Sequence, residues 1–98
     1  MNKAILVVDD TRSMRKMVSA VLAGAGYDVA EAGDGVEALA LAQTRQFDLV
    51  VTDHNMPRMD GVTLVRELRR LPVYDTVALI VLSTEVDPAL VASVFTIS

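Results

Sequence analysis

Cysteine is absent from the chain and histidine occurs once, which excludes a disulfide framework and a metal site built from thiolates or clustered imidazoles. Aromatic residues make up only 4% of the sequence while hydrophobic residues make up 52%, so the core must be aliphatic. Basic residues are not in excess either, because the net charge is -4 at pH 7. A surface of this sign argues against nucleic acid as a direct partner.

Long hydrophobic runs are also missing. The apolar run at residues 4–8 is far too short for the core of a signal peptide or for a membrane span. The 98 residues suffice for one small domain, which we expect to occupy positions 1–98. These features predict a cytoplasmic protein with no membrane association.

Short apolar runs alternate with stretches of helical spacing along the sequence. Strands are expected at residues 4–8, 28–32, 49–53 and 77–82, and helices at residues 11–23, after the capping residue Asp34, at residues 61–70 and from Asp87-Pro88 onward. Continuous rather than alternating apolar runs are typical of strands buried on both faces, as in a parallel sheet. The alternation predicts an α/β fold with a doubly wound parallel sheet in strand order 2-1-3-4.

The first expected helix carries a broad apolar side. Met14, Met17 and Val21 recur at helical spacing together with Val18 and Leu22. We therefore expect this side to pack on the sheet, and the two methionines to fill the core rather than to take part in chemistry.

Oxygen-bearing side chains stand at the ends of three expected strands: Asp9 and Asp10 after the first, Asp53 at the third, and Ser83 after the fourth. Parallel strands end along one edge of the sheet, and the first and third strands are neighbours in this order, so the three aspartates should meet. Three carboxylates in one pocket repel one another unless their pKa values rise or a cation binds. An all-oxygen ligand set suits Mg²⁺ or Mn²⁺, and a hard cation beside a carboxylate suits phosphoryl transfer.

Five stretches carry a combined pattern: Val7-Val8-Asp9-Asp10 followed by Ser13, Met14 and Arg15; Ala32-Gly33-Asp34-Gly35 with Glu37 and Ala38; residues 48–53; Met56-Pro57 with Met59-Asp60-Gly61; and Leu82-Ser83-Thr84-Glu85. On these stretches the chain resembles the receiver domains of bacterial two-component response regulators, and is most similar to their stand-alone chemotaxis (CheY-like) type. The resemblance covers about residues 3–92 and implies a flavodoxin-like fold.

The resemblance implies a role for each residue at the strand ends. Asp53 would be the phosphoacceptor, and the donor would be a phosphohistidine on a sensor histidine kinase. Asp10 and Asp53 would ligate Mg²⁺ directly, together with the main-chain carbonyl of Asn55. Asp9 would act through a metal-bound water molecule, and Ser83 would supply the hydroxyl that moves when Asp53 is phosphorylated.

The match does not extend to the family's fifth strand, which ends in a lysine before proline, or to its fifth helix, so we expect a receiver fold truncated after the fourth helix. The only lysines are Lys3 and Lys16, and neither is placed to replace the family's lysine. Arg58 is the one cation in the loop after the third strand, and its position is expected to face solvent. Residues 91–98 could extend the fourth helix or form a strand, because periodicity does not decide between them.

The missing helix predicts an incompletely covered sheet. Apolar residues of the third and fourth strands would be uncovered on the side of the first helix, and the fourth strand would be an open edge. We therefore expect a homo-oligomer, formed by edge pairing or by exchange of the tail.

Three functions remain open from the sequence. The first is a phosphoryl-accepting signalling domain, which promotes its own phosphorylation without being a turnover enzyme and acts by binding a sensor kinase and a motor or phosphatase protein. The second is an interaction or oligomerisation module that keeps the fold and the acidic residues but is impaired in phosphorylation. The third, a small nucleotide or flavin binder, is disfavoured because Asp9-Asp10-Thr11 stands where a glycine-rich phosphate loop would follow the first strand.

Overall fold

Strands and helices alternate in the computed structural model, which is described over residues 2–83 and 93–96, with the backbone alone for Ser83 and residues 93–96. The elements are β1 (Ala4–Val8), α1 (Arg12–Gly24), β2 (Asp28–Ala32), α2 (Gly35–Thr44), β3 (Leu49–Asp53), α3 (Gly61–Arg69), the short 3₁₀ helix η1 (Pro72–Tyr74), β4 (Ala78–Ser83) and β5 (Ser93–Thr96). The fourth helix expected from Asp87 lies outside the described residues. None of the helices within residues 2–83 combines the length and the apolar character that crossing a membrane requires.

The sheet has the order β2-β1-β3-β4-β5. The first four strands in sequence, β1 to β4, are mutually parallel, so the predicted flavodoxin-like arrangement in order 2-1-3-4 is confirmed. Continuous apolar sequence suits the interior position of β1, whose five residues are all buried between β2 and β3.

The tail adds a fifth strand that the sequence left undecided. Residues 93–96 form β5, which pairs antiparallel with β4, Phe95 lying opposite Val81. A parallel connection takes about a dozen residues or more, whereas an antiparallel one can be shorter. The interval between Ser83 and Ser93 is short enough to favour the antiparallel pairing. The prediction that the fourth strand would be an open edge is therefore wrong, because β5 takes up its free side.

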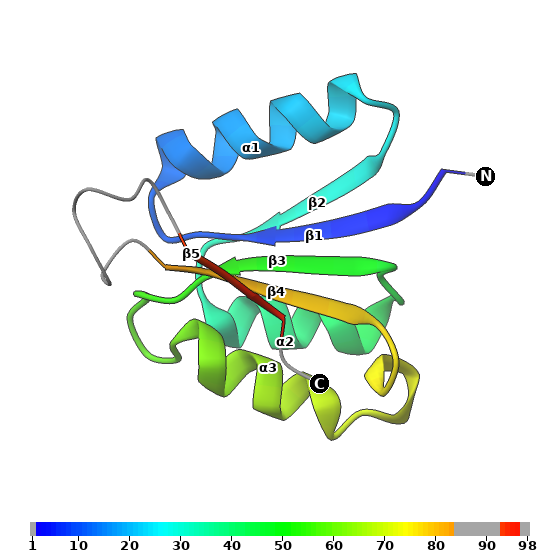
Figure 1. Ribbon diagram of the computed structural model, residues 1–98, viewed down its shortest axis with the longest axis vertical. Helices are drawn as coiled ribbons and strands as arrows, with labels where there is room; N and C mark the ends of the chain where they lie inside the picture. Colours follow the sequence, from blue (N-terminus) through cyan, green and yellow to red (C-terminus); the bar gives the residue numbers. More distant parts are fainter. Residues whose placement is uncertain (1, 84–92, 97–98) are drawn as a thin grey trace.

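The helices form a layer on each face of the sheet. Figure 1 shows α1 on one face and α2 and α3 on the other. The larger core lies under α2 and α3, where Leu64, Val65 and Leu68 pack with Val50 and Leu79 of the sheet. On the other face α1 lies beside β1 and β2, and of the helices that the structure describes none covers the rest of β3 and β4 there.

The apolar side of α1 packs on the sheet only in part, because Val18 and Leu22 are half-buried while the rest of this side is exposed. Met14, Met17 and Val21 are 49%, 61% and 69% exposed, so the prediction that they fill the core is wrong. The side that faces the sheet carries Arg15 and Ser19 beside Val18 and Leu22, and Ser19 is buried. The side chain of Arg15 is only 17% exposed because its guanidinium finds acceptors on β2 and at the end of β1.

Candidate functional site

The acidic side chains meet at the carboxyl ends of β1 and β3. These strands are neighbours, and Val8 pairs with Thr52, so the residues that follow them emerge at one edge of the sheet. Carboxylate oxygens of Asp9, Asp10 and Asp53 lie within 4.8 Å of one another. The prediction that the three aspartates meet is confirmed. Asp9 and Asp53 are half-buried, while Asp10 is exposed.

Two of the three carboxylates are held by backbone amides. Thr11 N–H donates to Oδ1 of Asp9 at 2.9 Å, and His54 N–H donates to Oδ1 of Asp53 at 2.9 Å. The same His54 N–H also points to the carbonyl oxygen of Leu82 on β4, 3.1 Å away. Asp10 makes no side-chain hydrogen bond to any described residue, so the fold places it only through its backbone.

The loop after β3 is closed against the start of α3. Gly61 N–H donates to the carbonyl of His54 at 3.0 Å, and Asp60 caps α3 by accepting from Thr63 N–H at 2.8 Å. A Cβ added at Gly61 would lie 2.5 Å from the carbonyl oxygen of Asp53, so only glycine allows this approach. The start of α3 therefore packs directly against the main chain of Asp53.

Burial raises the pKa of the Asp53 carboxyl above its ordinary value, and the negative charge of Asp9 and, less strongly, of Asp10 adds to the rise. The hydrogen bond from His54 N–H acts in the opposite direction, because it favours the ionised carboxylate. Because the net effect is a rise in pKa, the charged form of Asp53 is less favourable in the folded chain than in the unfolded chain.

Asp53→Asn is expected to raise the free energy of unfolding at neutral pH when no divalent cation is present. The raised pKa means that the stability linked to protonated Asp53 is fully present below the ordinary value of 3.8 and is lost as the pH rises through the higher folded value. The asparagine variant escapes this loss, so its advantage should vanish at low pH. Urea unfolding across a pH series measures it.

Asp60→Asn is the control with the opposite sign. The hydrogen bonds from Thr63 lower the pKa of Asp60, so this carboxylate stabilises the fold above its ordinary pKa and the stabilisation is lost on acidification. The variant should therefore be less stable than the wild type at neutral pH. Equal pH profiles for Asp53→Asn and the wild type would contradict the repulsion inferred among the three carboxylates.

The other residues expected at the site are placed only in part. Asn55 is exposed in the loop two residues beyond β3, and the backbone of Ser83 ends β4 next to β3, where Leu82 pairs with Asp53. Arg58, expected to face solvent, is 62% exposed and forms an ion pair with Asp34, the residue that caps α2. The backbone of Arg58 has a φ of 68°, which is unusual for a residue with a side chain. The ion pair with Asp34 joins this loop to the start of α2.

Arg15 is the residue near the site that the sequence pattern missed. Helical spacing placed it outside the apolar side of α1, yet its guanidinium donates to the carbonyl oxygen of Asp9 at 2.7 Å and to Glu31 at 3.0 Å. Lys16 pairs with the other oxygen of Glu31 at 3.2 Å. The acceptors of Arg15 lie on β2 and after β1, so the sequence of α1 alone could not predict these contacts.

The comparisons with known proteins agree on one family. The family model described as "Response regulator receiver domain" matches residues 5–97. Over 70 residues the chain is 46% identical to the alkaline phosphatase synthesis transcriptional regulatory protein PhoP of Bacillus subtilis, covering 71% of this chain and 29% of that protein. Over 79 residues it is 43% identical to the chemotaxis protein CheY-3 of Vibrio cholerae, covering 74% of this chain and 61% of that protein.

A solved structure gives the same result. The chemotaxis response regulator CheY4 of Vibrio cholerae superposes with a TM-score of 0.85 at 43% sequence identity, covering 91% of this chain and 74% of CheY4. The matched region spans less than two thirds of the length of each of the two curated relatives, 29% of PhoP and 61% of CheY-3. The similarity therefore concerns this region of those proteins rather than their whole length.

Proposed function

Because this chain belongs to the family of response regulator receiver domains, we propose that it is a signalling domain that accepts a phosphoryl group on Asp53. Receiver domains are signalling proteins rather than enzymes with a separate substrate, and they interact with histidine kinases. The observation that carries the proposal is the cluster of Asp9, Asp10 and Asp53, whose carboxylate oxygens lie within 4.8 Å of one another.

In the proposed step, an oxygen of the Asp53 carboxylate attacks the phosphorus of a phosphohistidine on a sensor histidine kinase. The P–N bond breaks, its electron pair returns to the imidazole, and an acyl phosphate forms on Asp53. Phosphoryl transfer requires from the protein mainly positioning and neutralisation of charge. Positioning comes from the end of β3, where the N–H of His54 holds one oxygen of Asp53 at 2.9 Å.

A divalent cation fits the same cluster by its chemistry. The three carboxylates offer only hard oxygen ligands, which suit Mg²⁺ or Mn²⁺, and their repulsion is relieved when a cation binds. Asp10 and Asp53 would hold the ion directly and Asp9 through a water molecule. The main-chain carbonyl of Asn55 would complete the protein ligands. The ion would neutralise negative charge on the phosphoryl oxygens.

Ser83 would convert phosphorylation into a signal. It stands one residue beyond Leu82, the partner of Asp53 in the sheet, so its hydroxyl would donate a hydrogen bond to a phosphoryl oxygen and shift when that group arrives. The output would be a change in protein–protein contacts with a motor or phosphatase protein of a chemotaxis system in the cytoplasm. The net charge of -4 makes nucleic acid an unsuitable partner.

Incubation with acetyl phosphate tests the proposal without a kinase. We expect a phosphoryl adduct in the intact mass when Mg²⁺ is present and none when the cation is removed by a chelator, because transfer requires charge neutralisation. In this reaction the P–O bond to acetate breaks and Asp53 gains the phosphoryl group. The absence of an adduct from protein shown to be folded by circular dichroism would contradict phosphoryl acceptance.

A phosphorylation-impaired interaction module is the second candidate, favoured by the positions of the lysines. The chain has two, of which Lys16 pairs with Glu31 and Lys3 lines a groove with Ile5 and Ala78, at the end of the sheet away from Asp53. Neither of these two lysines is therefore held at the acidic cluster. A folded chain without an adduct in the acetyl phosphate experiment would favour this candidate.

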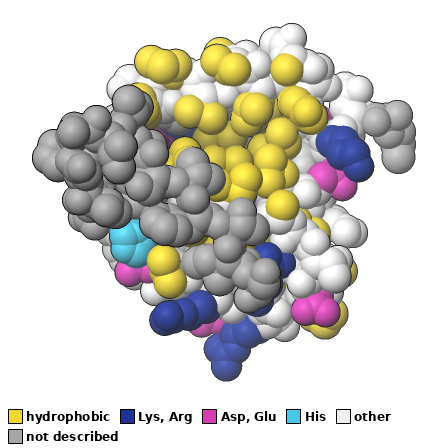
Figure 2. Space-filling model, in the orientation of Figure 1, with side chains coloured by type: hydrophobic (Ala, Val, Ile, Leu, Met, Phe, Trp, Pro, Cys, Tyr) yellow, Lys and Arg dark blue, Asp and Glu magenta, His cyan; other side chains and the backbone are white. Residues whose placement is uncertain are grey.

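Self-association is the further part of the proposal, and it uses the sheet face on the side of α1. Figure 2 shows hydrophobic side chains gathered over α1 and over the sheet beside it. The α1-side face, as we name it, consists of Met14, Met17 and Val21 of α1 with Val51 and Ile80, which pair in register and are half-buried. None of the five is charged, so two copies can bring this face together without opposing like charges. Pairing through the β4 edge is not the route, because β5 occupies it.

Light scattering at micromolar concentration tests this association. We expect a dimer for the wild type and a monomer for Met17→Glu, because two such carboxylates would be buried across the interface. Val73→Glu is the matched control, since Val73 is 52% exposed but belongs to η1, outside the α1-side face. A monomeric wild type would contradict the proposal, and so would a dimer that persists in Met17→Glu.

A further inference from the structure

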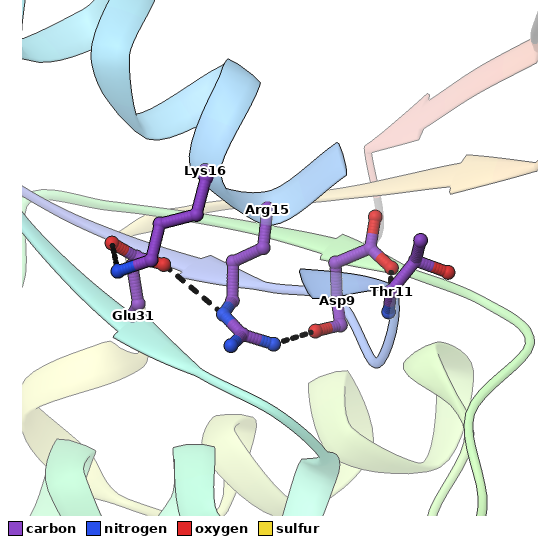
Figure 3. A network of polar contacts seen from close by, with 5 residues as sticks. All are labelled: Asp9, Thr11, Arg15, Lys16 and Glu31. Atoms are coloured by element: carbon purple, nitrogen blue, oxygen red, sulfur yellow. Dashed lines mark hydrogen bonds and ion pairs between the residues drawn. The ribbon is translucent and has the colours of Figure 1, made fainter. Parts of the chain in front are cut away.

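The guanidinium of Arg15 joins the acidic edge to two neighbouring elements. Its Nη1 donates to the main-chain carbonyl oxygen of Asp9 at 2.7 Å, and its Nε donates to Oε1 of Glu31 on β2 at 3.0 Å. Figure 3 shows Arg15 extending from α1 between these two acceptors, with Lys16 on the far side of Glu31. The Arg15 and Glu31 side chains are 17% and 24% exposed, so the pair is largely screened from water.

The carbonyl that Arg15 holds belongs to the peptide bond between Asp9 and Asp10. A peptide unit is planar, so fixing its oxygen also fixes the orientation of the Asp10 N–H and the place of its Cα. The Asp10 carboxylate makes no hydrogen bond to any described residue, and Asp10 is exposed, so the fold places this carboxylate only through the backbone that carries it. The other end of this turn is held separately, by the bond from Thr11 N–H to Asp9 at 2.9 Å.

From this geometry we infer that Arg15 is a positioning residue for cation binding, which acts by holding the Asp9 carbonyl and thereby aiming the Asp10 carboxylate at the ion. The inference rests on the proposed function, in which Asp10 is a direct ligand. Groups that orient metal ligands without touching the metal commonly change affinity when they are removed. Glu31 has a lesser part, because it holds the guanidinium but not the turn.

The sign of the effect separates positioning from simple charge. Arg15 is a cation near the site, so electrostatics alone would make Mg²⁺ or Mn²⁺ bind more tightly once the guanidinium is removed. Positioning has the opposite consequence, since a turn without its bond to Arg15 presents Asp10 in many orientations. A weaker affinity in a variant without the guanidinium therefore cannot come from the loss of its charge.

Titration with Mn²⁺ alone, followed by electron paramagnetic resonance, measures both affinity and ligand geometry. Arg15→Met keeps the apolar stem and removes every donor, and we expect its Kd for Mn²⁺ to rise about tenfold with a broadened bound spectrum. Glu31→Gln leaves the bond from Arg15 to Asp9 intact and should change the Kd far less. Arg15→Lys keeps the charge but lacks the two-sided geometry of guanidinium, so it should restore affinity only in part. Thermal unfolding of each variant verifies that it is folded.

The outcomes distinguish the inference from the function on which it rests. Unchanged or tighter Mn²⁺ binding by Arg15→Met, with an unaltered spectrum, would overturn the role of Arg15 while leaving the cation site in place. If Arg15→Met does not fold, Arg15→Lys with wild-type affinity would overturn it equally. A wild type that binds no Mn²⁺ would remove the proposed cation site and the inference with it.

Discussion

The Asp53→Asn variant should show no phosphoryl adduct after incubation with acetyl phosphate and Mg²⁺. Asparagine has nearly the same shape, so the hydrogen bond from His54 N–H and the end of β3 should be retained. The amide lacks the anionic oxygen that attacks phosphorus, and it also removes one of the three negative charges proposed to hold the cation. Intact-mass spectrometry over a time course gives the extent of reaction directly.

Asp60→Asn is the matched control for this experiment. Asp60 lies in the same loop and caps α3, and asparagine is also a capping residue, so the variant should remain folded despite its expected loss of stability. This variant should form the adduct as the wild type does. An adduct of equal yield in Asp53→Asn would mean that another group is the acceptor, and peptide mapping would then identify it.

Gly61→Ala should produce the largest loss of stability among single small substitutions at the site. The added Cβ would lie 2.5 Å from the Asp53 carbonyl oxygen and 3.0 Å from Cα of His54. Both are backbone atoms, so no side-chain rotation relieves the contact. Overpacking of this kind costs about 1–3 kcal/mol, and a backbone clash belongs at the upper end of that range. Urea unfolding measures the change in the free energy of unfolding.

Gly24→Ala provides the contrasting control. Outside the backbone of α1 itself and the two chain neighbours, no described atom lies within 4 Å of a Cβ added at Gly24, the last residue of the helix. Alanine should therefore stabilise the helix by about 0.5–1 kcal/mol.

The Gly61→Ala variant should in addition form the phosphoryl adduct more slowly, because the displaced backbone belongs to the acceptor. An unchanged free energy of unfolding for Gly61→Ala would show that the loop moves aside at little cost.

The acidic cluster was predictable because it depends only on where the strands end and on their order in the sheet. Strand ends are visible as apolar runs followed by Asp9-Asp10 or ending in Asp53, and the parallel order places those ends together. No side-chain geometry is needed for that conclusion. The capping roles of Asp34 and Asp60 were predictable for the same reason, since a cap acts on a residue three positions away.

The faces of α1 were not predictable in this way. Helical period shows which residues share a side of α1 but not which part of that side meets the sheet. Met14 and Met17 remain exposed, while Val18 and Leu22 are half-buried. Arg15 is half-buried because its acceptors lie at the end of β1 and on β2, which no window within the helix includes. The pairing of β5 was undecidable for a related reason, since it depends on the free side of β4 rather than on residues 93–96 alone.

The order of the strands in the sheet also determines which strands lose their hydrogen bonds first when the native structure opens locally. β5 has a partner on one side only, whereas β1 is flanked by β2 and β3 and buried along its whole length. Native-state opening proceeds from such weakly held edges towards the centre, so amide protons of β5 should exchange with solvent first and those of β1 last. The three aspartates follow β1 and end β3, and thus stand on the slowest-opening part of the sheet. Fraying of the tail strand and loss of the acidic site are therefore separate events, and the chain can release one while retaining the other.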